Sequence, residues 1–92
     1  MLITKKIKII NPQGLHARPA SNLVKLVSKF ESDVMVRKGG EAVNGKSIMS
    51  LMTLAANHGA VLEVEVSGPD AEEAMKAIEA FLTKDTEEDD IK

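Results

Sequence analysis

Two segments far apart in this chain alternate apolar with polar residues, and this pattern most restricts the folds open to it. Residues 2–10 interleave isoleucine with lysine. Residues 62–66 place one glutamate between each leucine or valine and the next. Successive side chains of a strand point to opposite faces, so each segment is predicted to be a strand with one buried face and one wet face. A fold for this chain must therefore lay an apolar layer against one face of a sheet.

The remaining segments predict a hairpin and three helices. Gly39-Gly40 is a two-residue turn between short strands, because glycine tolerates positive φ. Ser47 is a preferred N-cap residue and opens a short apolar helix, which Asn57-His58-Gly59 ends. In chain order we expect strand 2–10, helix 16–29, strand 34–38, strand 41–43, helix 48–56, strand 62–66 and a last helix that begins at Pro69-Asp70 and buries Ala74, Ile78, Phe81 and Leu82.

This β-α-β-β-α-β-α order favours an α+β domain of two layers. Each strand has one apolar face and each helix one apolar stripe, and helices that cover one face of an antiparallel sheet bury both. The length of 92 residues suffices for one such domain, which we assign to residues 1–84. Residues 85–92 are too rich in charge to pack and are expected to form a disordered acidic tail.

Composition and charge exclude several kinds of protein. The chain has no cysteine, which excludes a disulfide framework, and no segment approaches the roughly 20 apolar residues of a membrane span. The first strand interleaves its apolar residues with lysines, unlike a signal peptide. A net charge of −2 provides no broad basic field for nucleic acid. We expect a cytoplasmic protein with no direct membrane insertion, and we further expect a monomer without a cofactor.

His16 is the strongest candidate for chemistry. It follows the turn-forming residues Asn11, Pro12 and Gly14 and stands where a helix is predicted to begin. Backbone N–H groups at a helix start lack partners and carry the positive end of the helix dipole, which stabilises anions and phosphate in particular. The same potential favours a neutral, nucleophilic imidazole. Arg18 can reach the same anion, since its guanidinium fork fits phosphoryl oxygens.

A metal site is not predicted. His16 and His58 are far apart in the sequence, and no cysteine accompanies them. His58, next to Gly59, is interpreted as a residue at a helix C-terminus that is compatible with the helix dipole there.

Two motifs give the chain a resemblance to a known family. Residues 14–20, GLHARPA, resemble the phosphohistidine signature of HPr, the small phosphocarrier of the bacterial phosphoenolpyruvate-dependent sugar phosphotransferase system. Residues 46–49, KSIM, resemble the regulatory-serine motif of that family. The resemblance runs from the first strand to the last helix. It implies an open-faced β-sandwich, in which three helices cover one face of a four-stranded antiparallel sheet, and an HPr-like phosphocarrier domain in residues 1–84.

The resemblance also implies a mechanism and partners. His16 would take a phosphoryl group on Nδ1 from phospho-Enzyme I and pass it to the IIA domains of sugar transporters. Arg18 would assist, and the backbone N–H groups of Ala17 and Arg18 would stabilise the added charge. Such a protein is a carrier and not a free-standing enzyme, because its partners supply most of the catalysis.

Ser47 has a second expected role beside capping. In the family a kinase, HPr kinase/phosphorylase, phosphorylates this serine, which impedes docking with Enzyme I and can create a surface for a transcriptional regulator. A phosphate at a helix N-cap is tolerated structurally, and it would add about −1.5 to −2 charges to a docking surface.

The short helix after Ser47 is expected to divide its apolar residues between core and surface. We assign Leu51 and Leu54 to the core, and Met49 and Met52 to partner contact, since flexible methionines suit a surface that meets several partners. The expected partner-binding residues are Ala17, Ser21, Ile48, Met49 and Met52.

Two alternative functions stay open. One is that of NPr, a nitrogen-related paralogue of HPr with the same fold and histidine chemistry, whose relay ends in regulation. The other is that of a purely regulatory binding protein on this fold. The histidine of such a protein is expected to be degenerate, whereas His16 and Arg18 are both present here.

Overall fold

The alternating segments form one antiparallel sheet of four strands, in the spatial order β1-β4-β2-β3. The computed structural model describes residues 1–84. In chain order the elements are β1 (Leu2–Lys8), α1 (Ala17–Val27), β2 (Asp33–Lys38), β3 (Glu41–Asn44), α2 (Ile48–Thr53), β4 (Val61–Ser67) and α3 (Ala71–Leu82). The predicted fold class and element order are confirmed. The predicted tail, residues 85–92, lies outside the described residues.

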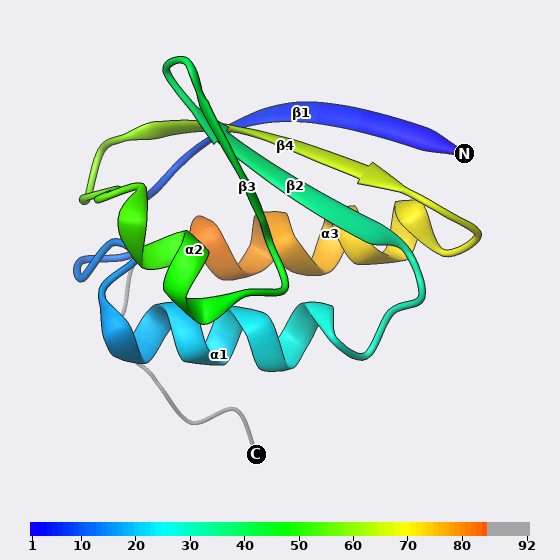
Figure 1. Cartoon of the computed structure of the whole chain (residues 1–92), viewed down its shortest axis with the longest axis horizontal. Coiled ribbons are helices and arrows are strands. Elements are labelled where there is room, and N and C mark those ends of the chain that lie inside the picture. Colours follow the sequence, from blue (N-terminus) through cyan, green and yellow to red (C-terminus); the bar gives the residue numbers. More distant parts are fainter. Residues whose placement is uncertain (85–92) are drawn as a thin grey trace.

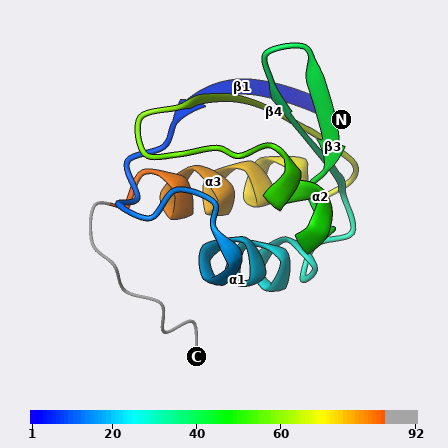
Figure 2. The ribbon, with the colours of Figure 1, turned by 60° about the vertical axis from the view of Figure 1, so that its left-hand side comes forward.

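All three helices lie on one side of the sheet (Figure 1). The helix α1 packs against both α2 and α3, and α3 also packs against β1 and β4. A view turned by 60° shows the same two layers, with α2 next to β3 and above α1 (Figure 2). Within residues 1–84 no element covers the other face of the sheet, so the domain is an open-faced sandwich.

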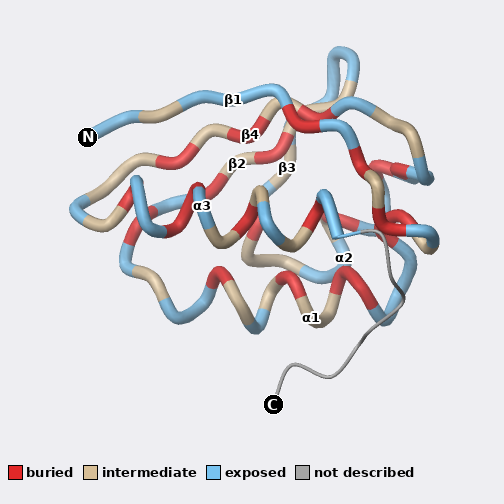
Figure 3. The backbone as a smooth tube through the Cα atoms, turned by 180° about the vertical axis from the view of Figure 1, so that it is seen from behind, coloured by how far each residue is buried: buried red, intermediate tan, exposed pale blue. Residues whose placement is uncertain are grey.

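The core lies between the sheet and the helices. Leu62, Val64 and Val66 of β4 point into it, and the glutamates between them do not, so buried and partly exposed positions alternate along the strand (Figure 3). The helical side of the edge strand β1 also carries Lys5, whose Nζ reaches Glu79 Oε1 on α3 at 2.6 Å. The apolar stem of Lys5 thus extends along the edge of the core, and its ammonium group reaches the partly exposed surface.

The first strand ends two residues before its predicted end. After Lys8 the chain is still tied to the loop before β4, because Ile9 N–H donates to the Ala60 carbonyl at 2.8 Å. It then turns towards the end of α3, where Ile10 N–H donates to the Leu82 carbonyl at 2.8 Å. Ile9 is fully buried. The alternation therefore predicts the burial of Ile9 correctly, although this residue lies outside the strand.

The helix α2 ends at Thr53, with Leu54 as its C-cap, and not at Ala56 as predicted. Ala55 follows with a φ of +50°, the left-handed region that turns the chain out of the helix. The predicted position of His58 at a helix C-terminus is wrong for the same reason. His58 is an exposed residue of the loop that leads to β4. The helix α1 is also shorter than the predicted 16–29, with caps at His16 and Ser28.

Asp70, predicted to open the last helix, is the N-cap residue of α3, and its carboxylate also holds a distant loop. It accepts hydrogen bonds from Glu31 N–H at 2.9 Å, from Ser32 N–H at 3.0 Å and from Ser32 Oγ at 2.5 Å. The hydrogen bond from Ser32 Oγ, followed by that from Glu31 N–H, holds the pKa of Asp70 below its usual value. Gly68 permits this approach, since a Cβ there would lie 2.5 Å from Ser32 Oγ.

We predict that Asp70→Asn destabilises the fold at neutral pH and weakens its response to acid. An amide presents only one acceptor atom to the donors that now share the carboxylate. Because the pKa of Asp70 is lowered by folding, its contribution to stability is present above the unfolded value of about 3.9 and is lost as pH falls through the lower folded value. Urea unfolding at pH 7 and pH 3 measures both effects. Asp33→Asn, at an exposed position of β2, is the control, and equal behaviour of the two variants would contradict the prediction.

Ala55→Gly is expected to raise the free energy of unfolding by about 1 kcal/mol, because only glycine adopts positive φ without a steric cost. The matched control is Ala80→Gly at an exposed position of α3, which should lower it by about 1 kcal/mol. Thermal unfolding of both variants measures this difference in sign. Two variants that are destabilised alike would refute the strain at Ala55.

Candidate functional site

His16 is the N-cap residue of α1. Its backbone is extended, with φ −72° and ψ −174°, and its carbonyl accepts the first helical hydrogen bond from Ala20 N–H at 2.9 Å. The residue is exposed, and among the described residues its side chain makes no capping hydrogen bond. The imidazole therefore stands at a helix start without being used to cap it.

A tight loop delivers the chain to this position. Asn11 Oδ1 accepts from Gln13 N–H at 2.9 Å, and the Asn11 carbonyl accepts from Gly14 N–H at 3.1 Å. Gly14 has a φ of +61°, which suits glycine. Leu15 is buried, so the loop is anchored in the core immediately before His16.

The same loop is bonded to the segment that follows α2. Leu15 N–H donates to the Ala56 carbonyl at 2.8 Å. A Cβ on Gly14 would lie 2.6 Å from that carbonyl oxygen and 2.8 Å from Asn57 Cα, so only glycine allows the two backbones to approach so closely. This contact places residues 55–57 beside His16.

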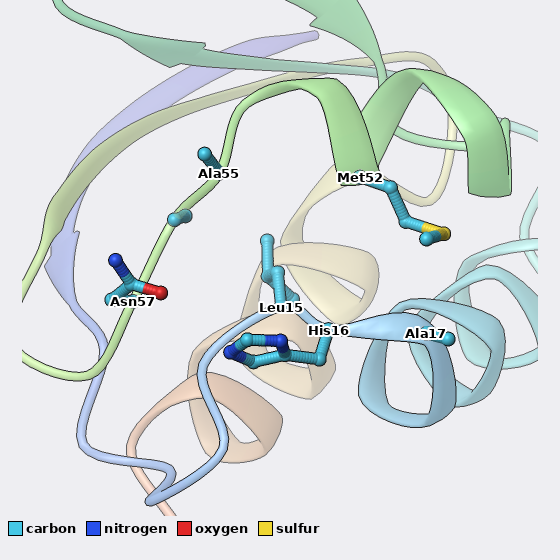
Figure 4. Close-up of a pocket in the computed structure, with 7 residues that line it drawn as sticks. Leu15, His16, Ala17, Met52, Ala55 and Asn57 are labelled. Carbon is cyan, nitrogen blue, oxygen red and sulfur yellow. The ribbon is translucent and has the colours of Figure 1, made fainter.

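A pocket of about 240 Å³ lies between these two segments (Figure 4). One wall comes from the start of α1 and the other from the end of α2 and the turn after it. The imidazole of His16 lies across the pocket from Asn57, whose Oδ1 is on the side of the imidazole and whose Nδ2 points away from it. The residues that line the pocket are Leu15, His16, Ala17, Met52, Ala55, Ala56 and Asn57.

The structure brings together some of the predicted site residues and separates others. His16, Ala17 and Met52 line the pocket. Arg18 is exposed at the second position of α1. The others, Ser21, Ser47, Ile48 and Met49, are not among the pocket-lining residues.

Ser47 has the capping role that its sequence predicts. Its Oγ accepts from Ser50 N–H at 3.2 Å at the start of α2. The turn before it is held by Asn44, whose Oδ1 accepts from Lys46 N–H at 2.8 Å, and by the Lys46 ammonium group, which donates to the Phe30 carbonyl at 2.9 Å. These contacts fix the start of α2 relative to the end of α1.

The apolar residues of α2 divide as predicted. Leu51 and Leu54 are 0% and 3% exposed, whereas Met49 and Met52 are 77% and 45% exposed. Ile48 is also exposed. Large apolar side chains therefore gather at the surface beside the pocket, where they can meet another molecule.

Three pocket residues, Ala55, Ala56 and Asn57, are not predicted from the sequence. The pattern places the first two in a helix and the third at its end, whereas the chain turns out of the helix at Ala55. Local pattern gave no signal that they lie near His16, because that proximity comes from a contact between distant segments.

The part of the chain that the structure describes offers little for other kinds of site. Residues 1–84 contain no group of three or more histidine, cysteine, aspartate or glutamate side chains arranged to hold a metal ion. Within the same residues no helix is long and apolar enough to cross a membrane.

The geometry allows one kind of chemistry well. An exposed imidazole beside an open pocket can attack an electrophile that a second protein presents. The N–H groups of Ala17 and Arg18 lie in the first turn of α1, at the positive end of the helix dipole, where anions are stabilised.

Comparison with known proteins agrees with this fold. The family model described as "PTS HPr component phosphorylation site" matches residues 3–84. Two relatives named phosphocarrier protein HPr, from Neisseria meningitidis and Treponema pallidum, are 48% and 40% identical to the chain; they cover 84% and 96% of it and 86% and 100% of their own lengths. The solved structure of HPr from Bacillus anthracis superposes with a TM-score of 0.86 at 37% identity, over 88% of this chain and 96% of that one. This chain therefore belongs to the HPr family of phosphocarrier proteins of the phosphotransferase system.

Proposed function

We propose that this chain carries a phosphoryl group on His16, which it accepts from phospho-Enzyme I and transfers to the IIA domains of sugar transporters. The observation that supports this most is the exposed imidazole at the start of α1, which borders an open pocket and makes no capping hydrogen bond within the described residues. Membership of the HPr family supports the same chemistry.

The transfer follows from the chemistry of the site. A ring nitrogen of His16, Nδ1 by analogy with the family, attacks the phosphorus of phospho-Enzyme I. A nitrogen–phosphorus bond forms to His16 as the bond between phosphorus and its donor on Enzyme I breaks. The N–H groups of Ala17 and Arg18 and the Arg18 guanidinium stabilise the charge that arrives.

A carrier also has to release what it binds. His16 is exposed, and the pocket beside it is open to solvent and lined mainly by small or apolar side chains. Such a site does not enclose the phosphoryl group with many donors, so the next partner can remove it. We infer that the partners supply most of the catalysis and that the chain alone is not an enzyme.

The exposed apolar residues beside the pocket form the docking surface of this proposal. Ile48, Met49 and Met52 of α2 lie next to the start of α1, which contributes Ala17 and Ser21. One chain provides both the histidine and this surface, so we infer that the protein acts as a monomer. We also propose that it acts in the cytoplasm.

His16→Ala is expected to abolish phosphoryl acceptance with little change in melting temperature, because the side chain is exposed. The measurement is incorporation of acid-labile phosphate from phosphoenolpyruvate in the presence of Enzyme I, mapped by peptide. His58→Ala removes the other histidine and is the matched control, which should be labelled like the wild type.

The other outcomes of this experiment discriminate between functions. A wild-type chain that is folded and takes no label from an active Enzyme I would favour the purely regulatory binding protein. Labelling followed by transfer to a nitrogen-related partner, and not to sugar-specific IIA domains, would favour the NPr-like relay.

We further propose that phosphorylation of Ser47 by a kinase regulates docking. The hydroxyl caps α2, so a phosphate would sit at the positive end of a helix and leave the fold intact. It would also place about two negative charges beside Ile48 and Met49, on the proposed docking surface. The same charge could be read by a transcriptional regulator.

Ser47→Asp is expected to raise the KM of Enzyme I for this chain several-fold, with a smaller effect on the maximal rate, because the added charge weakens docking. Thr4→Asp adds the same charge on the uncovered face of the sheet and should leave the KM unchanged. Ser47→Ala should cost about 1 kcal/mol of stability through the lost cap, and it should dock normally. An unchanged KM in Ser47→Asp would count against the regulatory proposal.

A further inference from the structure

The amide side chain of Asn57 is the polar group of the pocket that the proposed mechanism does not use. It lines the pocket on the wall opposite His16, with Oδ1 on the side of the imidazole and Nδ2 turned away from it (Figure 4). A rotation of the amide about its Cβ–Cγ bond exchanges the two atoms and brings Nδ2 to face the imidazole. Among the described residues no hydrogen bond involves this amide. The backbone carbonyl of Asn57, by contrast, accepts from Ala60 N–H at 3.0 Å and holds the turn. The backbone of Asn57 is therefore fixed, while its amide can rotate and present Nδ2 to a ligand in the pocket.

The position of Asn57 relative to His16 is fixed by the backbone contacts before α1. The Leu15 N–H bond to the Ala56 carbonyl joins the residues immediately before His16 and Asn57. Gly14 lies so close to Asn57 that a Cβ on it would be 2.8 Å from Asn57 Cα. These contacts place the backbones of His16 and Asn57 on facing walls of one pocket within the isolated chain.

The composition of the pocket makes Asn57 chemically distinctive. Its described lining consists of leucine, alanine and methionine side chains apart from His16 and Asn57. A phosphoryl group on the imidazole brings negative charge and three strong acceptor oxygens. A primary amide offers two N–H donors, so Asn57 can supply a donor from the side of the pocket opposite the helix start.

We infer that Asn57 donates a hydrogen bond from Nδ2 to a phosphoryl oxygen when His16 is phosphorylated, and thereby sets how tightly the chain holds the group. This inference rests on the proposed function at His16. It assigns donors to both sides of the phosphoryl group: the N–H groups of Ala17 and Arg18 on the helix side, and the Asn57 amide on the turn side.

The test compares Asn57→Ala and Asn57→Asp with the wild type in two measurements. The first is the equilibrium of phosphoryl transfer between Enzyme I and the chain. The second is the rate at which the isolated phosphorylated chain loses phosphate, which no docking surface influences. His58→Ala, at the next residue and outside the pocket lining, is the matched control.

Asn57→Ala is expected to shift the transfer equilibrium about three- to tenfold towards phospho-Enzyme I, the range for one lost hydrogen bond, and to speed the loss of phosphate from the isolated chain. Asn57→Asp should shift the equilibrium further, because a carboxylate of nearly the same shape donates no hydrogen bond and repels the phosphoryl oxygens. His58→Ala should match the wild type in both measurements. The variants should fold, since Asn57 is exposed and is not among the residues with positive φ.

The outcomes separate this inference from the function on which it rests. A wild type that is labelled on His16, with both Asn57 variants unchanged, overturns the inference alone. Asn57→Asp that retains phosphate as well as or better than Asn57→Ala also overturns it. In that case the side-chain oxygen at position 57 would act by accepting a hydrogen bond from the imidazole N–H, and not Nδ2 by donating to the phosphoryl group. A wild type that takes no label on His16 overturns the proposed function and this inference together.

Discussion

The close approach of Gly14-Leu15 to Ala56-Asn57 is the contact on which the site depends. Glycine at position 14 leaves room for the opposing backbone, and the hydrogen bond from Leu15 N–H to the Ala56 carbonyl then fixes the distance between the two segments. Because Leu15 is buried, the contact is also anchored in the core. His16 follows directly, so the wall of the pocket and the start of α1 are positioned by one interaction. The left-handed conformation of Ala55 is the local cost of bringing the second segment to this place.

The two-layer fold leaves the functional end of the molecule free. The apolar side chains of β4 and its neighbours share one core with residues of α1 and α3, and α3 packs directly against β1 and β4. The short helix α2 and its C-cap residue bury Leu51 and Leu54, so α2 stays packed on the core while Met49 and Met52 are exposed. At the other end of α1, Asp70 binds the Glu31-Ser32 backbone and keeps the loop after the helix against the start of α3. The helix that carries His16 is thus held at both ends.

The proposed carrier function requires a compromise that this arrangement meets. A phosphoryl group must be stabilised well enough to form and weakly enough to leave, and an exposed helix start beside a shallow, mostly apolar pocket provides few donors. Under the further inference, Asn57 adjusts this balance from a position outside the helix. Under the proposed regulation, phosphorylation of Ser47 would act on a different property, since the charge of the phosphate would change docking while Ser47 remains the N-cap residue of α2.

The sequence by itself determined the element order, the core faces and the main candidate for chemistry, His16. Alternation in residues 62–66 identified the buried face of a strand, and the turn residues before His16 located a helix start, because both signals depend on neighbours in the chain. Spacing within one helix also separated Leu51 and Leu54 from Met49 and Met52. Other features were decided only by tertiary structure. The end of α2 at Thr53, the displacement of His58 from a helix terminus and the place of Asn57 opposite His16 all follow from the contact between residues 14–15 and 56–57. No local pattern encodes that contact, because its hydrogen bond joins backbone atoms, which every residue except proline can provide.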